Sequence, residues 1–382
     1  MKVAMLCQYP LHKMWGGPAV YIDRLAYHLS CIKDVDLHVI TIGEEGKQFR
    51  RGNLNIHIVK IPKVLRVPFF IPFTTLILKH KVLKLDPDIV HAAQGTLPPY
   101  SLVAVLLKGR YPVLLTILGI ISKEAEYNTN IGYRIGTFFN QPIEKYVISR
   151  IPNIIVEAPS IRDLICKNTN SNIYINPVGI DYDKIEDMHK YKGESNFDIL
   201  YIGRLEKIKG VDILINSLYT VIKLIPGIKL YIVGSGSQAK NLKALARKLN
   251  LENNVKFLGF ISEMEKYQKF KACKLVVVPS RWDCQPFALF DAAASGVPVI
   301  ASDMSNPGIV DNGKTGFIFE SENIEDLANK IITLLKNDKL REEMGNAAKE
   351  KAKQYDWNKI AERTVEIYRE IIAKAKTKVM QH

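Results

Sequence analysis

The sequence predicts an α/β fold made of two Rossmann-like, doubly wound domains that face a cleft. Short apolar runs rich in β-branched residues recur along the 382-residue chain, with helical patterns between most of them. Runs that are apolar throughout are typical of strands buried on both faces of a parallel sheet. Strand and helix alternate twice over, which indicates two such sheets, and 382 residues are enough for two domains of ordinary size.

The first set of alternating elements defines an N-terminal domain, residues 1–178. Its helical patterns include Tyr21–Ser30 and Leu76–Lys84. Its predicted strands are VAMLC, LHVITIG, NIHIVKI, DIVHAA, PVLLTIL, NIIVEA and NIYINP. The boundary falls near the stretch NPVGIDYDK, Asn176–Lys184.

The second set defines a C-terminal domain, residues 179–356, followed by a helix. Its predicted strands are FDILYIG, IKLYIVG, VKFLGF, KLVVVPS, VPVIAS and GFIF. From Trp357 to about Lys374 the apolar residues recur at helical spacing, which predicts a long amphipathic helix. Ligands of doubly wound folds bind at the carboxyl ends of the strands, so we expect chemistry at the strand-to-helix turns.

Composition narrows the classes of partner and compartment. Lys and Arg number 53 against 39 Asp and Glu, a formal net charge of +14, which favours anionic partners such as nucleic acid, phosphorylated substrates or an acidic membrane surface. The five cysteines are scattered without a CxxC pair, which indicates a reducing compartment and argues against disulfides or a zinc site. No apolar run approaches the roughly 18 residues of a membrane span, so we expect a cytoplasmic protein.

Two glycine-rich turns join a predicted strand to a predicted helix. Gly16 and Gly17 follow the first strand, and Gly234 and Gly236 follow IKLYIV. Such glycines let backbone amides approach an anion closely at a helix N-terminus. Each turn alone is equally well explained as a tight connection.

A third turn, YIGRLEKIKG, carries two cations at one strand end. Arg204 follows the strand directly and Lys209 lies five residues later. An Arg fork and a Lys point charge can together clamp a diphosphate. A solvated, lysine-rich loop is the alternative.

The fourth turn, PSRWDCQPFALFDAAASG, places Asp283 and Asp291 eight residues apart. On a single helix this spacing would turn them about 80° apart, but Pro286 separates a turn from a helix, so both carboxylates can face the cleft. A carboxylate can accept two hydrogen bonds from the vicinal diol of a ribose or hexose. The first amides of the helix, on Phe287 and Ala288, can bind phosphate. Acidic residues that stabilise a helix N-terminus are the alternative, which explains Asp283 better than Asp291.

Together the four turns resemble the retaining glycosyltransferases of family four, which have the GT-B fold. The chain shows GG in the first turn, an echo of PNG-V-D near Pro177, and GRL…KG at the spacing of the family. It also has the VGxG turn at Val233–Gly236 and, within PS…LFDAAASGVPVI, an acidic pair where the family has two glutamates. The resemblance covers nearly the whole chain and implies that the C-terminal helix, 357–382, crosses back to the first domain.

The resemblance implies a role for each site residue. Asp291 would hold the ribose of the donor, Asp283 would contact the transferred sugar, and Arg204 with Lys209 would stabilise the leaving diphosphate. The amides of Phe287 and Ala288 would contact sugar or phosphate, and Ile261 would lie near the base. The implied reaction moves a sugar from a nucleoside diphosphate sugar to an acceptor hydroxyl of a glycan or lipid-linked molecule, in envelope glycoconjugate or protein-glycan synthesis. No metal or other cofactor is implied.

Two features depart from the family, and two further candidate residues lie outside its motifs. Both acids are aspartates rather than glutamates, and Leu118 stands where a histidine is common. These departures make a nucleotide-sugar-binding protein with reduced or lost transferase activity an alternative function. An epimerase of the same fold is a further alternative, although the family-four pattern argues against it. His91, which ends a predicted strand of the first domain, could face the acceptor, although a lone histidine is more often structural, and Glu124 is a similar candidate.

A basic segment, 47–84, suggests a membrane surface as a further partner. Asp and Glu are absent between Glu45 and Asp86, and RVPFFIPFTTLILKHK lies within the segment. Its nine cations are Lys47, Arg50, Arg51, Lys60, Lys63, Arg66, Lys79, Lys81 and Lys84. Basic residues beside exposed aromatic ones would suit an anionic membrane, which would place the protein at its inner face. The alternative is that the phenylalanines are core and the lysines merely solvated. The chain shows no nucleic-acid recognition pattern.

Overall fold

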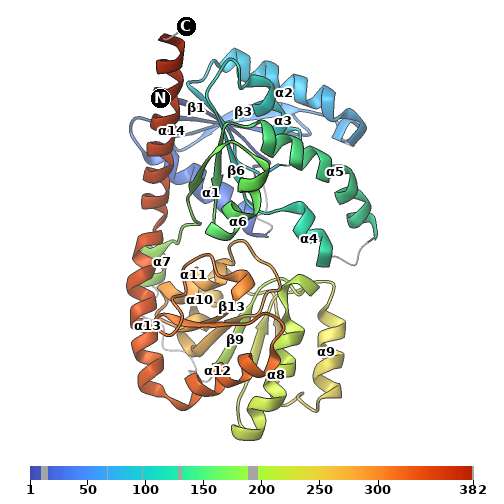
Figure 1. Ribbon diagram of the computed structural model, residues 1–382, viewed down its shortest axis with the longest axis vertical. Helices are drawn as coiled ribbons and strands as arrows, with labels where there is room; N and C mark the ends of the chain where they lie inside the picture. Colours follow the sequence, from blue (N-terminus) through green and yellow to red (C-terminus); the bar gives the residue numbers. More distant parts are fainter. Residues whose placement is uncertain (10–15, 67, 97, 128–130, 188–196, 381–382) are drawn as a thin grey trace. The chain divides into compact units, whose positions relative to one another are not determined.

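The computed structural model describes residues 1–9, 16–66, 68–96, 98–127, 131–187 and 197–380 (Figure 1). The chain divides into two compact units. Unit 1 contains Met1–Ser122, Asn130–Gly179 and Trp357–His382, and unit 2 contains Lys123–Thr129 and Ile180–Asp356. None of the helices that the structure describes is both long and apolar enough to cross a membrane.

Unit 1 is built on an eight-stranded sheet with the order β3-β4-β2-β1-β5-β6-β7-β8. The strands are β1 (Lys2–Leu6), β2 (Asp36–Gly43), β3 (Lys47–Arg51), β4 (Leu54–Lys60), β5 (Ile89–Ala92), β6 (Val113–Ile117), β7 (Asn153–Val156) and β8 (Asn172–Ile175). All pairings are parallel except that of β3 with β4. The inner strands β5, β6 and β7 are buried along their whole length, as predicted for a sheet covered on both faces.

Helices accompany this sheet. They are α1 (Gly16–Cys31), α2 (Ile71–Leu85), α3 (Tyr100–Leu107), α5 (Ile131–Arg150) and α6 (Pro159–Ile165), and the short 3-10 helices Lys63–Arg66 (η1) and Pro68–Phe70 (η2) precede α2. Helix α4 (Ile121–Tyr127) begins in unit 1, and its residues from Lys123 onward belong to unit 2. The last helix, α14 (Trp357–Met380), packs against α1 (Figure 1). The rings of Tyr21 and Trp357 meet edge to face at 5.8 Å, and Asn176 donates to Thr364 at 2.8 Å. The expectation that the C-terminal helix returns to the first domain is confirmed.

Unit 2 is a six-stranded, wholly parallel sheet with the order β11-β10-β9-β12-β13-β14. The strands are β9 (Phe197–Ile202), β10 (Leu230–Val233), β11 (Val255–Gly259), β12 (Cys273–Val278), β13 (Val299–Ser302) and β14 (Gly316–Phe319). The helices are α7 (Tyr182–Asp187), α8 (Val211–Leu224), α9 (Ala239–Lys248), α10 (Glu263–Ala272), α11 (Phe287–Ala294), α12 (Ile324–Lys336) and α13 (Asp338–Ala352). The predicted doubly wound α/β class is therefore confirmed.

The strand order of unit 2 reverses between β9 and β12. From β9 the chain adds β10 and β11 on one side, and then β12, β13 and β14 on the other. In open parallel sheets this reversal leaves a crevice at the carboxyl ends of the two central strands, where ligands bind. The turns that follow β9 and β12 are thus placed beside each other by the topology.

One strand was not predicted. β3 has the sequence KQFRR and is mostly exposed. It lies at the edge of the sheet and lacks the apolar run that identifies a buried strand, and charged residues of this kind are common on edge strands. The segment 47–84 is consequently divided among β3, β4, η1, η2 and α2.

The turns at the carboxyl end of the second sheet approach one another so closely that two of them require glycine. Gly210 has φ +65°, and a Cβ there would lie 1.9 Å from the carbonyl oxygen of Pro279 at the end of β12. Gly234 has φ +128°, and its Cβ would lie 1.9 Å from the carbonyl oxygen of Gly203 at the end of β9. The two glycines therefore allow the turn after β9 to pack directly against the turns after β10 and β12.

We predict that Gly210→Ala lowers the free energy of unfolding by at least about 1–3 kcal/mol, because the new Cβ combines a strained φ with a backbone clash. Urea unfolding followed by circular dichroism measures the loss. Two matched controls separate the causes. Gly313 has φ +79° with nothing near its Cβ, and Gly227 has open space at a φ outside the left-handed region. If Gly210→Ala and Gly313→Ala lower the free energy of unfolding equally, the clash with the Pro279 carbonyl does not contribute to the destabilisation.

Candidate functional site: the carboxyl ends of β9, β10 and β12

Lys209 and Asp283 lie on the two turns that flank the reversal of strand order. Lys209 ends the 3-10 helix Lys207–Lys209 after β9, and Asp283 lies between β12 and α11. Their side chains, each 16% exposed, form an ion pair of 2.5 Å between Nζ and Oδ2. Two residues that are 74 positions apart in the sequence thus share one site at the reversal.

The second aspartate lies deeper and pairs with a residue that the sequence analysis did not single out. Asp291 is on α11, buried, and its Oδ2 lies 2.7 Å from Nζ of Lys266 on α10. Burial raises the pKa of the Asp291 carboxyl, although Lys266 acts in the opposite direction. The carboxylate of Asp291 is thus a buried polar group in an otherwise apolar helix, and a partly exposed lysine of the neighbouring helix lies beside it.

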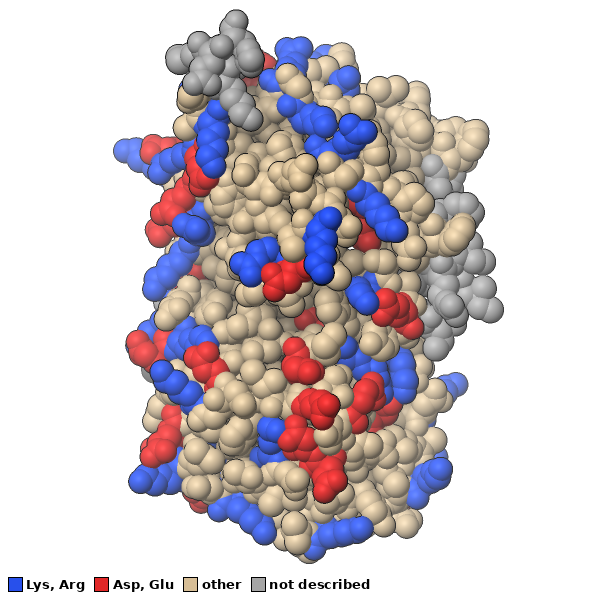
Figure 2. Space-filling view, in the orientation of Figure 1, with Lys and Arg blue, Asp and Glu red and all other residues tan. Residues whose placement is uncertain are grey.

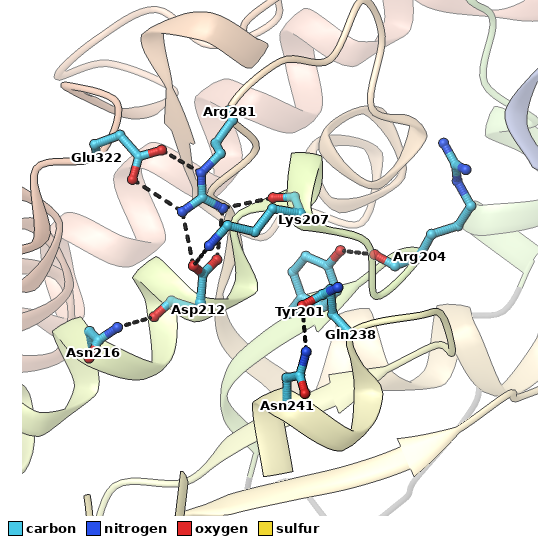
Figure 3. Close-up of polar contacts among 9 residues, drawn as sticks. All are labelled: Tyr201, Arg204, Lys207, Asp212, Asn216, Gln238, Asn241, Arg281 and Glu322. Atoms are coloured by element: carbon cyan, nitrogen blue, oxygen red, sulfur yellow. Dashed lines mark hydrogen bonds and ion pairs between the residues drawn. The ribbon is translucent and has the colours of Figure 1, made fainter. Parts of the chain in front are cut away.

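Arg204 is anchored through its backbone while its side chain is exposed. The Tyr201 hydroxyl donates to the Arg204 carbonyl oxygen at 2.9 Å, and burial raises the pKa of that hydroxyl, so it stays protonated. Figure 3 shows the guanidinium of Arg204 extending away from Tyr201. It forms no ion pair with any residue that the structure describes.

The turn after β10 holds the turn after β9 in place. Glu206 accepts hydrogen bonds from the backbone N–H of Ser237 at 3.0 Å and from its hydroxyl at 2.5 Å. The backbone N–H of Leu205 donates to Ser235, and that of Gln238 donates to Leu205. The predicted glycines Gly234 and Gly236 are thus explained by close packing of the two turns.

Arg281, in the same stretch as Asp283, joins three segments of the site (Figure 3). Its side chain is 7% exposed. Nη1 donates to the Lys207 carbonyl and to Asp212 Oδ1, both at 2.7 Å, and Nη2 donates to Asp212 Oδ2 at 2.9 Å and to Glu322 Oε2 at 3.1 Å. Nε donates to the second oxygen of Glu322, and the backbone N–H of Arg281 donates to Ile208. The 3-10 helix that carries Lys209 is therefore fixed to the turn that carries Asp283.

Several further groups lie at this end of the sheet. Phe287 and Ala288 occupy the first turn of α11, where backbone N–H groups have no acceptor within the helix. Ile261, half-buried, follows β11 beside Phe260, which is 76% exposed. The Nε1 of Trp282 is buried with no hydrogen-bond partner in the described parts of the chain. Buried unpaired donors are rare in native proteins and often belong to functional sites.

The remaining predicted residues belong to other elements. Gly16 and Gly17 begin α1 in unit 1, and Gly16 has φ +79°. Glu124 lies half-buried in α4, and Leu118 is half-buried directly after β6. Within the residues described, no group of three or more His, Cys, Asp or Glu could hold a metal ion.

His91 does not have the surroundings expected of an acceptor-facing residue. It is fully buried on β5, and its Nδ1 and Nε2 each lie 2.7 Å from a hydroxyl, those of Tyr368 and Thr116. Burial lowers the pKa of His91 to about 3, so the ring is neutral. We therefore correct the interpretation: His91 is a core residue that connects the sheet of unit 1 to α14.

Three residues of this site were missed: Lys266, Arg281 and Trp282. Arg281 and Trp282 stand within the stretch that drew attention to Asp283, but an Arg or Trp before an acid carries no recognisable signal. Lys266 lies 25 positions before its partner Asp291 on a helix with several other lysines. Only the packing of α10 against α11 distinguishes it from them.

Comparison with protein families covers most of the chain in two parts. Residues 183–351 match the family described as Glycosyl transferases group 1, and residues 15–184 match the family described as Glycosyltransferase Family 4. An uncharacterized glycosyltransferase of Methanocaldococcus jannaschii is 27% identical over 375 residues, which are 97% of this chain and 99% of that protein. The D-inositol 3-phosphate glycosyltransferase of Corynebacterium aurimucosum is 32% identical over 177 residues, 44% of this chain and 42% of that protein.

Solved structures show the same fold over nearly the whole chain. Sucrose-phosphate synthase of Thermosynechococcus elongatus has a TM-score of 0.77 at 18% identity and covers 98% of this chain and 99% of its own. Anabaena HepE in complex with UDP-glucose has a TM-score of 0.71 at 20% identity and covers 99% of this chain and 100% of its own. From the two family matches and this shared fold we conclude that the chain belongs to glycosyltransferase family 4, the retaining enzymes of GT-B fold that transfer a sugar from a nucleotide-sugar donor.

Proposed function

We propose that the site around Lys209, Asp283 and Asp291 binds the nucleoside diphosphate sugar and carries out the transfer to an acceptor hydroxyl. The observation that carries the proposal is the ion pair of Lys209 and Asp283 at the reversal of strand order in unit 2. One cation for a diphosphate and one carboxylate for a sugar hydroxyl lie there within hydrogen-bonding distance. The neighbouring pair of Asp291 and Lys266 adds a buried carboxylate that can accept from the ribose diol.

The charge that develops in the reaction appears on the diphosphate as the bond from the anomeric carbon to the phosphate oxygen breaks. Lys209 would stabilise that charge from the base of the site, and Arg204, whose exposed guanidinium is free of described acidic partners, would approach from the outer side. The amides of Phe287 and Ala288 add neutral donors from the N-terminus of α11. In this scheme Lys209 exchanges Asp283 for a phosphate oxygen while Asp283 turns to a sugar hydroxyl. Gly16, Gly17, Gly234, Gly236 and Ile261 are proposed to line the donor site, and Glu124 remains the acceptor-side candidate.

The shorter acids have a structural counterpart. An aspartate carboxylate lies one methylene closer to the backbone than a glutamate, and here each carboxylate is met by a lysine, Lys209 or Lys266. The aspartates can accept hydrogen bonds from hydroxyls of the ligand, and the two lysines can donate to oxygens of the same ligand. We therefore propose that Lys266 belongs to the donor site and shares the ribose or the adjacent phosphate with Asp291.

The nucleotide of the donor can be proposed from a protein of the same fold. HepE binds UDP-glucose in its complex, so UDP sugars are the first donors to examine, followed by GDP sugars. The acceptor is proposed to be a hydroxyl of a glycan or lipid-linked molecule.

Turnover with retention is the direct test of the proposed function. The purified chain is incubated with α-linked UDP and GDP sugars and a panel of glycan and lipid-linked acceptors, and the product is examined by NMR. An α-linked product is expected. Nucleotide binding without any product across the panel would support a protein with lost activity, and epimerised nucleotide sugar without acceptor would support an epimerase.

Replacing Asp291 is expected to separate binding from stability. Asp291→Asn should weaken binding of the nucleoside diphosphate at least about tenfold, since a charged acceptor is lost, as measured by calorimetric titration. The pKa of Asp291 is raised in the folded chain, so the folded chain holds this proton more tightly, and ionisation lowers stability as the pH rises through the raised pKa. At neutral pH the free energy of unfolding should therefore be unchanged or higher in Asp291→Asn.

The control for this experiment is Asp338→Asn, whose side chain is 90% exposed. It should leave nucleotide affinity unchanged. Unaltered affinity in Asp291→Asn as well would show that Asp291 is a helix residue without contact to the donor.

Lys209 is expected to act on the rate. Lys209→Ala should reduce kcat about 100- to 1,000-fold, the usual effect of removing one group that stabilises developing negative charge. Lys207, two residues earlier, is the matched control, because its side chain pairs with Asp212 and is 45% exposed. Lys207→Ala should retain most of the activity, with thermal unfolding confirming that both variants fold. Equal losses of kcat in the two variants would contradict the role given to Lys209.

A further inference from the structure

One side of α2 in unit 1 is both apolar and basic, and we define the α2 face by these exposed residues. The apolar ones are Val64, Phe69, Phe73 and Leu76, which are 67%, 84%, 50% and 56% exposed. The basic ones are Lys63, Arg66 and Lys84. The three elements that carry them, η1, η2 and α2, pack against one another.

Helical spacing places the outward residues in one row. Phe73, Leu76, His80 and Lys84 of α2 are separated by three, four and four positions, so they lie on one side of the helix. Phe69 precedes them in η2. The opposite side, with Thr74, Thr75, Leu78 and Val82, is buried. The row is apolar in its first half and polar to basic in its second half.

The polar groups on the buried side of α2 are satisfied by hydrogen bonds within the helix. The hydroxyl of Thr75 donates to Ile71 at 2.7 Å, and that of Thr74 donates to Ile71 at 2.9 Å. Phe69 in η2 and Phe73 in α2 are both exposed, so neither is a core residue. Large apolar side chains grouped on an exposed surface usually mark an interaction site.

The charged residues of the segment that carries the α2 face are all basic. From Ile61 to Leu85 the sequence has five Lys and Arg, namely Lys63, Arg66, Lys79, Lys81 and Lys84, and neither Asp nor Glu. Among the described residues, Lys63 has a partner in Glu44, but the two side chains are 76% and 62% exposed, and such pairs are easily exchanged. Figure 2 shows tan surface with blue side chains beside it in the region where α2 lies in Figure 1.

Arg51, which belongs to the basic segment, does not contribute to the α2 face. Arg51 on β3 forms an ion pair of 3.1 Å with Asp23 and donates to the Tyr9 hydroxyl at 3.2 Å. The charge of Arg51 is therefore neutralised by Asp23 within unit 1. The α2 face is thus narrower than the segment 47–84 that the sequence indicated.

From these observations we infer that the α2 face binds the surface of an anionic lipid bilayer. Phe69, Phe73, Leu76 and Val64 would enter the boundary between headgroups and acyl chains, and the cations at 63, 66 and 84 would lie at the lipid phosphates. An anionic bilayer complements both properties of the face. A second copy of the chain presented with the same face would bring like charges together.

This inference bears on the partner of the enzyme and is independent of the donor site, because vesicle binding needs no nucleotide sugar. If it holds, the acceptor that the enzyme meets most often is one carried by the membrane.

The full-length chain is tested by flotation with vesicles of phosphatidylcholine alone and of phosphatidylcholine with phosphatidylglycerol. Binding is expected only with the anionic lipid and should fall as salt rises. Phe69→Ser with Phe73→Ser should weaken binding at least about tenfold. Lys63→Gln with Lys84→Gln should weaken it about fivefold for each charge removed.

Matched controls come from unit 2. Phe260 is 76% exposed, and Lys240 and Lys339 are exposed lysines. Phe260→Ser and the double variant Lys240→Gln with Lys339→Gln should bind vesicles as the unchanged chain does. In addition, Phe69→Trp should show a blue shift of fluorescence when anionic vesicles are added. Thermal unfolding checks that every variant is folded.

Three outcomes would overturn the inference: no flotation at low salt with anionic vesicles, equal weakening by the control variants, or no blue shift in Phe69→Trp. Sedimentation velocity at several protein concentrations examines the competing occupant. Self-association that Phe69→Ser with Phe73→Ser abolishes would assign the face to a second copy of the chain instead.

Discussion

The buried guanidinium of Arg281 is the interaction on which the geometry of the proposed donor site depends. A guanidinium has five N–H donors, and all five are used, on the Lys207 carbonyl, on both oxygens of Asp212 and on both oxygens of Glu322. Burial alone would lower the pKa of Arg281, but the two carboxylates outweigh it and the pKa is raised. A lysine could not span these three partners, because its single ammonium lacks the planar fork. The position of Lys209 relative to Asp283 thus follows from one side chain that touches neither of them.

Two acidic residues of unit 2 are each paired with a lysine, but their pKa values shift in opposite directions. Asp212 is held ionised: burial opposes ionisation, and hydrogen bonds from Arg281 and Lys207 overcome it and lower the pKa. Asp291 is the opposite case, since burial raises its pKa despite Lys266. A carboxylate that is poorly stabilised by its own protein gains more from the hydroxyl donors of a ligand than one that is already satisfied. This contrast separates a structural acid from one suited to binding, although both are paired with a lysine.

The apolar runs were enough to predict both sheets, because strands of a parallel sheet are buried on both faces and their sequences show it. They could not reveal β3, which is charged and lies at an edge. The turns with Lys209, Asp283 and Asp291 were found from residue type and position after a strand. Their partners were not, since Lys266 and Arg281 are recognised only from contacts across the fold. His91 shows the converse error: it ends a strand as a site residue would, but Tyr368 and Thr116, distant in the sequence, make it a core residue.

The same limit applies to the α2 face, where composition alone left two interpretations of the phenylalanines open. Helix α2 has Thr74, Thr75, Leu78 and Val82 on one side and Phe73 and Leu76 on the other, so apolar residues lie all round it and its sequence does not say which side is buried. The fold buries the side that contains two threonines, whose hydroxyls donate to carbonyl oxygens of the preceding turn. The larger and more apolar side chains are left outside. The proposed contact with a bilayer would cover the exposed Phe73 and Leu76.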